Sequence, residues 1–386
     1  MTSEERRAGR YARRKAAREA KRAETARYWD NYRKVFTYGH LYDSARICKH
    51  GVNWKATVQR YGLIPGQRVT DSYTDLRCGK VAPVKFQRFA IYERGHLRYI
   101  KSVGMRTRVE QRTGCDHALM PAITRHLIYD CGACVKGKGQ TFSERRFMRH
   151  LCRTIKKYGT DAWVLFYDFH GYFDSIDHAR IKAAIGKLFR DRRLTYVFGK
   201  WVDAFRDPGC APRGLGLGSQ ISQGLALEHA NGLDHAMKEG LRIKGYGRYN
   251  DDGYAFAGSK QELEQALEVI RAICDSLGIE LNEKKTRIQK ITQPMHYLKK
   301  VYKVTPTGRV VKLVSRKSKV RQRRKLKKLA KKVQAGLLTV RDAWQSFQSW
   351  RSGVKRARGY NAIKNMMRLF NSLFSRRWRF VLQAGT

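Results

Sequence analysis

The sequence has no long hydrophobic run. Within its 386 residues, no stretch of about 18 consecutive apolar residues occurs, which is the length that a membrane-spanning helix requires. The N-terminus is charged and lacks the apolar core of a secretion signal. We therefore expect a protein that has no contact with a membrane, is not secreted and works in the cytoplasm.

Paired cysteines are scarce as well. The eight cysteines are scattered along the chain, which suits a reducing compartment better than a framework of disulfides. Only Cys131 and Cys134 have the Cys-x-x-Cys spacing, whereas a structural zinc site normally shows two such pairs. We favour a buried structural pair at these positions and keep a metal site as the alternative.

Acidic residues are few relative to basic ones. Against 81 Lys and Arg the chain has 32 Asp and Glu, which gives a net charge of +49. A chain with this charge binds polyanions, so nucleic acid is the expected partner. The segment 299–386 has 26 Lys and Arg and one acid, Asp342, so it contributes +25. We expect this segment to contact nucleic-acid backbone.

Two of the few acids are adjacent. Asp251 and Asp252 lie in the stretch 248–257, at a probable hairpin turn before an apolar strand. Asn-Asp-Asp-Gly is a common turn sequence, so a simple turn is one interpretation. Paired carboxylates are also hard ligands for Mg²⁺, and a site that holds two metal ions needs a further carboxylate from elsewhere.

A third carboxylate lies upstream. Asp168 follows the apolar run 162–167, which predicts a buried strand with an acid at its C-terminal end. Together the two stretches resemble motifs A and C of the reverse transcriptase palm. Asp168 is followed five residues later by Phe173, and Tyr249-x-Asp251-Asp252 comes about 80 residues further on.

The resemblance implies an α+β right-hand polymerase with fingers, a palm built on an antiparallel sheet, and a C-terminal helical thumb. Two Mg²⁺ ions, or Mn²⁺ as an alternative, would be held by Asp168, Phe169, Asp251 and Asp252. Phe173 would lie under the sugar of the incoming nucleotide and exclude a 2′-hydroxyl group. Between these motifs, the glycine-rich stretch 214–226 occupies the motif B position.

Motif B resembles that of diversity-generating retroelement reverse transcriptases and related bacterial and phage enzymes. Gly216 departs from the Pro that is usual, and Ser219 departs from the Asn that the retroelement group favours. The resemblance places Leu217, Gly218 and Gln223 at the incoming nucleotide. Many reverse transcriptases have Gln at the position of Leu217, and apolar contact discriminates mispaired bases less well than a hydrogen bond does. We therefore expect frequent misincorporation opposite template adenine.

Other predicted sites flank these motifs. Segment 277–286 resembles motif D, where Lys285 would neutralise the leaving pyrophosphate or act as general acid. Strands are predicted at 88–93 and 97–100, in a hairpin that resembles the fingers. Arg98, or less directly Arg94, would bind the triphosphate. Segment 295–299 takes the position of the primer-grip turn, with Lys299 in place of the usual Gly.

We divide the chain on this basis into four parts. They are a basic N-terminal extension (1–35), fingers (36–160), a palm with part of the fingers and motifs A to E (161–298), and a basic helical thumb (299–386). Helical periodicity is expected in the extension, at 261–277 and through much of 316–374. No stretch that resembles a ribonuclease H or endonuclease follows.

The function implied by the resemblance is synthesis of DNA on an RNA template, in a bacterial or phage-infected cell. Its partners would be an RNA template, a DNA or RNA primer, deoxynucleoside triphosphates and a small accessory protein. Two alternatives stay open. One is an anti-phage defence polymerase that copies its own non-coding RNA or extends without a template. The other is an RNA-binding protein whose polymerase activity is lost.

Overall fold

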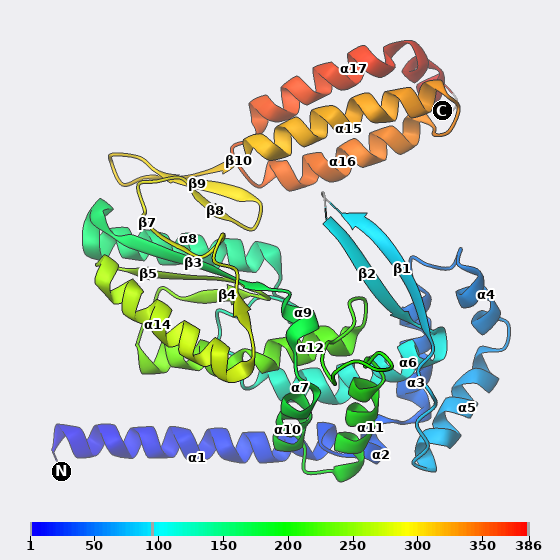
Figure 1. Ribbon diagram of the computed structural model, residues 1–386, viewed down its shortest axis with the longest axis vertical. Coiled ribbons are helices and arrows are strands. Elements are labelled where there is room, and N and C mark those ends of the chain that lie inside the picture. The colour runs from blue at the N-terminus through cyan, green and yellow to red at the C-terminus, as the bar shows by residue number, and fades with distance from the viewer. Residues whose placement is uncertain (1, 94–95, 384–386) are drawn as a thin grey trace. The chain divides into compact units, whose positions relative to one another are not determined.

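The computed structural model describes residues 2–93 and 96–383 (Figure 1). The chain forms two compact units, each containing helices and antiparallel strands, which confirms the α+β prediction. No helix in the described ranges is both long and apolar enough to cross a membrane. The first unit comprises Met1–Ser143, Phe166–Tyr254 and Glu264–Arg287, and the second comprises Glu144–Leu165, Ala255–Leu263 and Ile288–Thr386.

The first unit begins with helices and one hairpin. Thr2 and Glu5 close a capping box at the start of the long first helix, and Asn31 and Thr37 cap the next two, which explains why these helices start where they do. The elements are α1 (Ser3–Trp29), α2 (Tyr32–Val35), α3 (Tyr38–Lys49), α4 (Ala56–Gly62), α5 (Pro65–Arg77), β1 (Phe86–Glu93), β2 (His96–Val103), α6 (Met105–Gly114), η1 (Cys115–Leu119) and α7 (Met120–Thr124).

The predicted hairpin is confirmed. Strands β1 and β2 pair antiparallel, with Ala90 opposite Tyr99 and Ile91 opposite Arg98. Arg94 lies outside the described residues. The hairpin is held at its base, because the ring of Phe86 packs on Phe205 at 5.3 Å between centroids.

A five-stranded sheet forms the centre of the fold. Its order is β4-β5-β3-β6, and β7 also pairs with β3. The buried apolar run that precedes Asp168 makes β3 the central strand. The elements here are α8 (Gln140–Tyr158), η2 (Gly159–Asp161), β3 (Trp163–His170), α9 (Tyr172–Ser175), α10 (His178–Leu188), α11 (Arg192–Asp203), α12 (Gln220–His229), α13 (Asn231–His235), η3 (Ala236–Gly240), β4 (Gly247–Tyr249), β5 (Asp252–Ala257), α14 (Lys260–Leu277), β6 (Glu280–Leu281) and β7 (Arg287–Lys290).

The second unit contains a three-stranded sheet of β8 (Met295–Tyr297), β9 (Lys300–Val304) and β10 (Val310–Val314). Its first turn contains Lys299, the residue that replaces the usual Gly of the primer-grip turn. Leu298 and Lys299 both adopt positive φ, 46° and 67°, and form a two-residue turn between paired Tyr297 and Lys300. Side chains in this region of φ are strained, so the strand pairing on either side has to hold the turn.

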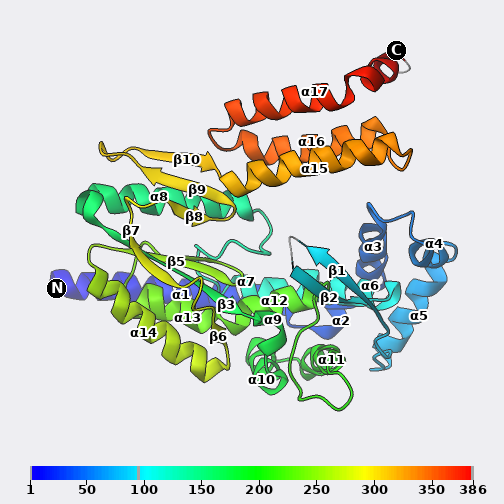
Figure 2. The same cartoon turned by 45° about the horizontal axis from the view of Figure 1, so that its top comes forward.

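Three helices complete the second unit (Figure 2). They are α15 (Arg316–Gln334), α16 (Val340–Lys355) and α17 (Tyr360–Gln383). Their apolar faces meet in one cluster that includes Leu326, Phe347 and Phe370, as the spacing of these residues indicates. The basic residues of α15 lie mostly on its exposed side.

Candidate active site

Three carboxylates predicted from separate motifs meet in the first unit. Asp168 lies near the end of β3 and is 4% exposed. Asp251 lies in the two-residue turn between β4 and β5, and Asp252 begins β5, the strand beside β3. The turn is tight because Asn250 adopts positive φ, 55°, which Asn tolerates better than most residues. Sheet pairing therefore brings the three acids together.

Asp168 is held from the segment that follows β6. The Nζ atom of Lys285 donates to Asp168 Oδ2 at 2.7 Å, and the side-chain amide of Asn282 donates to the same oxygen at 3.2 Å. The backbone of Asn282 also donates to the carbonyl of Asp168 at 2.8 Å. Lys285 was predicted for this site. Asn282 was not predicted for this site, although its position three residues before Lys285 could have indicated it.

The carboxylates interact strongly with one another. Burial, reinforced by Asp251 and by a hydrogen bond to Asp168, raises the pKa of Asp252 to about 7. The pKa of Asp251 is also raised, mainly by burial and further by Asp168, although Lys285 and Arg98 oppose the rise. Burial acts to lower the pKa of Lys285, but its hydrogen bond with Asp168 and the charges of the three acids raise it. The site therefore has more negative charge than Lys285 balances.

This donor set suits Mg²⁺. Carboxylate oxygens are its preferred protein ligands, and a divalent cation would relieve both the burial cost of the charges and the repulsion that together raise the two pKa values. Within the described residues, no three His, Cys, Asp or Glu side chains converge tightly enough to be a preformed metal site. Phe169 is buried and pairs with Leu281 of β6, and its role as a metal ligand stays a prediction.

A buried ion pair supports the β4–β5 hairpin, which carries Asp251 and Asp252 and is called the catalytic hairpin below for its predicted role. Arg248 and Asp234 are both fully buried, and the guanidinium binds both oxygens of Asp234 at 2.7 to 3.0 Å. The same guanidinium donates to the carbonyls of Asn250 and Leu227, each at 3.0 Å. It therefore connects the turn that carries Asp251 to helices α12 and α13. Sequence reasoning did not find this pair, because Asp234 lies in a different element.

The two strands that carry the acids approach each other closely. A side chain at Gly253 would lie 2.0 Å from the ring of Tyr167, so only glycine fits there. The hydroxyl of Tyr167 lies 2.6 Å from that of Tyr246, which donates to Asp234 at 2.7 Å. These buried hydrogen bonds join β3 to the ion pair under the hairpin.

Four of the predicted nucleotide-binding residues lie on three segments, which are β2, the loop before α12 and α9. Arg98 of β2 lies close enough to lower the pKa of Asp251. The backbone of Lys101 in β2 donates to the carbonyl of Leu217 at 3.3 Å, and Gly218 lies against Ile100. Phe173 is half-buried and its carbonyl accepts from the backbone of Leu215 at 2.7 Å. Motifs A and B are therefore joined to each other by a hydrogen bond, and motif B is joined to the β1–β2 hairpin by another.

One of the two motif B departures, Gly216, has a steric explanation. A side chain at Gly216 would lie 2.7 Å from the ring of Phe205, so the Pro that is usual has no room here. The hydroxyl of Ser219 is buried and donates to Gln111 at 2.8 Å. After motif A, Asp177 caps α10, while Asp174 is exposed.

The cysteine pair differs from the expectation. Cys131 is buried, but Cys134 is exposed and adopts positive φ, 54°, so the predicted buried pair is wrong for Cys134. The thiol of Cys134 lies 3.6 Å from the side-chain oxygen of Gln223 and 3.8 Å from that of Asn250. Gln223 and Asn250 of the β4–β5 turn therefore both contact Cys134, and the role of Gln223 at the nucleotide stays a prediction.

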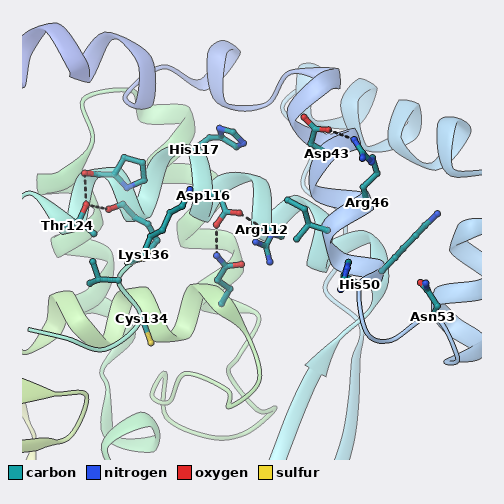
Figure 3. Close-up of a pocket in the computed structure, with 16 residues that line it drawn as sticks. Asp43, Arg46, His50, Asn53, Arg112, Asp116, His117, Thr124, Cys134 and Lys136 are labelled. Carbon is teal, nitrogen blue, oxygen red and sulfur yellow. Dashed lines mark hydrogen bonds and ion pairs between the residues drawn. The ribbon is translucent and has the colours of Figure 1, made fainter. Parts of the chain in front are cut away.

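Cys134 also lines a cleft of about 1380 Å³ (Figure 3). Its walls come from α3, α6, η1, α7, the loop around Lys136, and Gln220 of α12. Arg112 pairs with Asp116 at 3.1 Å, and Gln220 donates to the same carboxylate at 2.7 Å. Cations including Arg46, Lys49 and Lys136 line the cleft, which adjoins the hairpin through Cys134.

Comparison with known proteins identifies part of the chain. Residues 136–299 match the family model of the reverse transcriptase, an RNA-dependent DNA polymerase. This segment contains Asp168, Asp251, Asp252 and Lys285, so the match supports the predicted resemblance at the level of the family domain. No curated protein matches the sequence.

Solved structures with a similar course of the chain include telomerases from two yeasts. A truncated apo telomerase from Candida tropicalis is 14% identical to this chain. The match covers 64% of this chain and 59% of the telomerase chain, with a TM-score of 0.45. Telomerase from Candida albicans in complex with a fragment of telomeric RNA is 10% identical. That match covers 72% of this chain and 58% of the telomerase chain, with a TM-score of 0.47. This chain therefore spans slightly less than three fifths of the length of each of those two chains.

The buried ion pair predicts separable effects on stability and catalysis. Arg248→Met leaves the Asp234 carboxylate buried without its cation, so we expect a loss of about 3–5 kcal/mol in the free energy of unfolding. Arg248→Met combined with Asp234→Leu should recover most of this loss, because no uncompensated charge stays buried. Denaturant unfolding measures both variants.

Catalysis should not recover in the double variant. The carbonyl of Asn250 still lacks its donor there, so the turn that carries Asp251 is less well positioned. We expect the rate constant for nucleotide incorporation to stay at least about tenfold below wild type, because small displacements of catalytic groups cost that much. Full recovery of the rate along with stability would show that the pair has no positioning role.

The raised pKa of Asp252 predicts a stability that depends on pH. An unfolded Asp has a pKa of about 3.9, so the native protein binds an extra proton between that pH and about 7. Stability contributed by this proton is lost as the pH rises through 7. In EDTA at pH 8, Asp252→Asn should therefore be more stable than wild type, by at most about 4 kcal/mol.

The gain should shrink toward pH 5, where Asp252 is protonated in wild type too. Thermal unfolding at the two pH values measures the difference. Asp174→Asn serves as the control, because this exposed acid lies outside the cluster. An equal gain for Asp252→Asn at both pH values would contradict the assignment of the raised pKa to this group.

Proposed function

We propose that this protein is an RNA-directed DNA polymerase. The observation that carries the proposal is the meeting of Asp168, Asp251, Asp252 and Lys285 from three separate segments, all inside the range that matches the reverse transcriptase family model. The four residues provide metal ligands and a cation at one place. These are the groups that nucleotidyl transfer requires.

The metal site would be formed by the carboxylates of Asp168, Asp251 and Asp252. Two bound Mg²⁺ ions supply activation of the primer 3′-hydroxyl and neutralisation of the leaving pyrophosphate. Because its neighbours raise its pKa, Lys285 stays protonated at neutral pH, and it can pass a proton to the leaving group. Asn282 orients Asp168 through two hydrogen bonds.

The nucleotide would lie between β2 and motif B. Arg98 is an exposed cation on the strand that borders the Leu217 segment, and its fork can bind the triphosphate. Gly218 lies against Ile100 of the same strand, and Gln223 shares the thiol of Cys134 with Asn250 of the β4–β5 turn. The ring of Phe173 would then lie against the sugar.

The nucleic-acid strands would be bound by charge. The cleft beside Cys134 has Lys49 and Lys136 among its cations and would hold the RNA template near the hairpin. Segment 299–386 has a charge of +25 and would hold the phosphates of the primer and template, which is the role of a thumb. We propose a DNA or RNA primer and deoxynucleoside triphosphates as the other substrates.

The biological role belongs to the same proposal. We favour a diversity-generating retroelement, because an apolar residue, Leu217, takes the motif B position of Gln in many reverse transcriptases. An anti-phage defence enzyme that copies its own non-coding RNA would use the same catalytic residues. The third candidate, an RNA-binding protein without activity, is disfavoured because all three carboxylates are present and close together.

Loss of one carboxylate tests the activity itself. Asp251→Asn should lower nucleotide incorporation at least about a hundredfold, because metal ligation supplies several kcal/mol of transition-state stabilisation. RNA affinity should be unchanged, since the strand-binding cations are intact. Primer extension and a filter-binding assay measure the two quantities. Asp174→Asn is the control, and wild-type extension by Asp251→Asn would refute the assignment.

Sugar selection tests the position of Phe173. Its ring is proposed to collide with a 2′-hydroxyl, so Phe173→Ala should lower the ratio of deoxynucleotide to ribonucleotide incorporation by about tenfold or more. Phe173→Tyr keeps the ring and should keep the ratio. Steady-state incorporation of the two nucleotide types measures it. An unchanged ratio in the Ala variant would place the sugar filter at another residue.

Fidelity tests the role of Leu217. Wild type should misincorporate opposite template adenine more often than opposite the other bases, and Leu217→Gln should reduce this excess by several-fold, because a misplaced pair would then leave a polar group unpaired. Sequencing of cDNA made on one defined RNA template gives the error rates. Equal error rates at all four bases, unaffected by the substitution, would exclude this role.

A further inference from the structure

The β1–β2 hairpin has two faces, and both carry exposed apolar side chains, since Phe89 (49% exposed) and Ile91 (38%) lie on the face of Arg98. In its register, Ala90 lies opposite Tyr99, and Tyr92 lies opposite Leu97. Residues opposite each other in an antiparallel pair project to the same side, so these four share one face. The predicted triphosphate ligand Arg98, opposite Ile91, projects from the other face. The first face therefore has no part in the proposed nucleotide site.

This first face is apolar, aromatic and exposed. Tyr92 is 76% exposed, Tyr99 is 73% exposed and Leu97 is 54% exposed. Neither tyrosine ring packs on another ring or a cation in the described ranges of the chain. Single exposed apolar residues are common on protein surfaces, but a contiguous group of them indicates a binding surface.

The base of the same face is fixed. Lys101 donates to the carbonyl of Phe205 at 3.0 Å and to Asp207 at 2.7 Å, and Arg88 pairs with Asp207 at 2.7 Å. Phe86 packs on Phe205 beside them. The strands continue beyond this anchor toward the tip (Figure 1). The exposed rings thus lie on a strand pair whose base is held in place.

The chemistry of the face indicates its ligand. Tyr92 and Tyr99 are diagonal neighbours across the two strands, at a spacing of roughly 7–8 Å, which suits two successive bases. Aromatic rings next to cations are the usual surface for unpaired nucleic acid, since every base has a face that stacks. Arg88 and Lys101 share one acid, Asp207, so one net positive charge is left at the base of the face, and the net charge of +49 favours a polyanion over an apolar protein partner.

We propose that Tyr92, Leu97 and Tyr99 form a stacking platform that binds an unpaired RNA strand through its bases. The identification of this strand as the template rests on the proposed function, while the binding itself does not. A tyrosine suits this role because its ring is apolar and its hydroxyl stays in water. The platform would hold bases outside the nucleotide site, on the opposite face of the strand that carries Arg98.

The test is RNA binding without catalysis. Affinity for a labelled single-stranded RNA 12-mer is measured by fluorescence anisotropy in EDTA, without nucleotides, over a series of KCl concentrations. Tyr92→Ala combined with Tyr99→Ala should weaken binding at least about tenfold, since each stacked base contributes about fivefold or more. The slope of log affinity against log salt should not change, because no phosphate contact is removed.

Matched controls separate stacking from other causes. The double Phe variant keeps both rings and should bind as wild type does. Leu63→Ala removes another highly exposed apolar side chain, 78% exposed, and should also have no effect. An RNA 12-mer with abasic sites should bind wild type at least about tenfold more weakly than the normal RNA, while the double Ala variant should distinguish the two poorly.

Several results would overturn the proposal. These are a double Ala variant within twofold of wild type, as expected if a protein partner covers this face, and a loss of affinity seen only as a changed salt slope. Equal effects of the Ala substitutions on duplex RNA and on single-stranded RNA would also overturn it, as would a stronger effect on single-stranded DNA. Equal thermal unfolding temperatures establish that the variants fold.

The outcome is independent of polymerase activity. A wild-type protein that fails to extend primers, yet binds RNA through the two tyrosines, would refute the proposed function and leave the platform standing. An active polymerase whose RNA affinity is indifferent to both tyrosines would refute the platform alone. Ultraviolet crosslinking of bound RNA, with peptides mapped by mass spectrometry, should yield adducts within 86–103, and adducts only elsewhere would contradict the location.

Discussion

Repulsion among Asp168, Asp251 and Asp252 is the constraint on which the rest of the site depends. Three acids held together in a partly buried place destabilise the fold, as the pKa of about 7 at Asp252 indicates. Lys285 offsets part of this charge through its contact with Asp168. The remainder has to be tolerated by the surrounding structure until a cation binds. A sheet with a well-packed interior can do so, because its strands cannot move apart to relieve the repulsion.

The Arg248–Asp234 pair is neutral, in contrast to the net negative cluster of the three acids. Both side chains are fully buried, so each would be costly alone, and together they are neutral and hydrogen-bonded. A pair of this kind adds little net stability compared with apolar side chains. Its contribution is geometric, since the guanidinium fork fixes the carbonyls of Asn250 and Leu227 at once. The buried Arg248 guanidinium thus holds the turn that carries Asp251 in place, although Asp251 and Asp252 in and beside this turn repel each other.

Much of this could be predicted from the sequence, because its signals are local. The run before Asp168, the pair Asp251-Asp252 and the position of Lys285 are all contained in short stretches, and a strand or turn has the same periodicity wherever it lies. The hairpin around Arg98 and the apolar spacing of α16 and α17 belong to the same class.

Features that depend on residues far apart in sequence could not be predicted in this way. Asp234 becomes the partner of Arg248 only after α13 has packed under β4, and Asn282 reaches Asp168 across 114 residues. The same holds for Cys134, which tertiary packing leaves exposed beside Asn250. Lys299 adopts positive φ although it is not a glycine, because the pairing of β8 with β9 overrides this local preference.

Strand alternation gives the β1–β2 hairpin two chemical characters from one element. Successive side chains of β2 point to opposite sides, so Arg98 and Tyr99, adjacent in sequence, project to different faces. The face of Arg98 acts on Asp251 through its charge, and the face of Tyr99 offers an apolar ring to solvent. A two-stranded hairpin has little stability of its own. The anchor of Phe86, Arg88 and Lys101 on the 205–207 segment is therefore what keeps both faces in position.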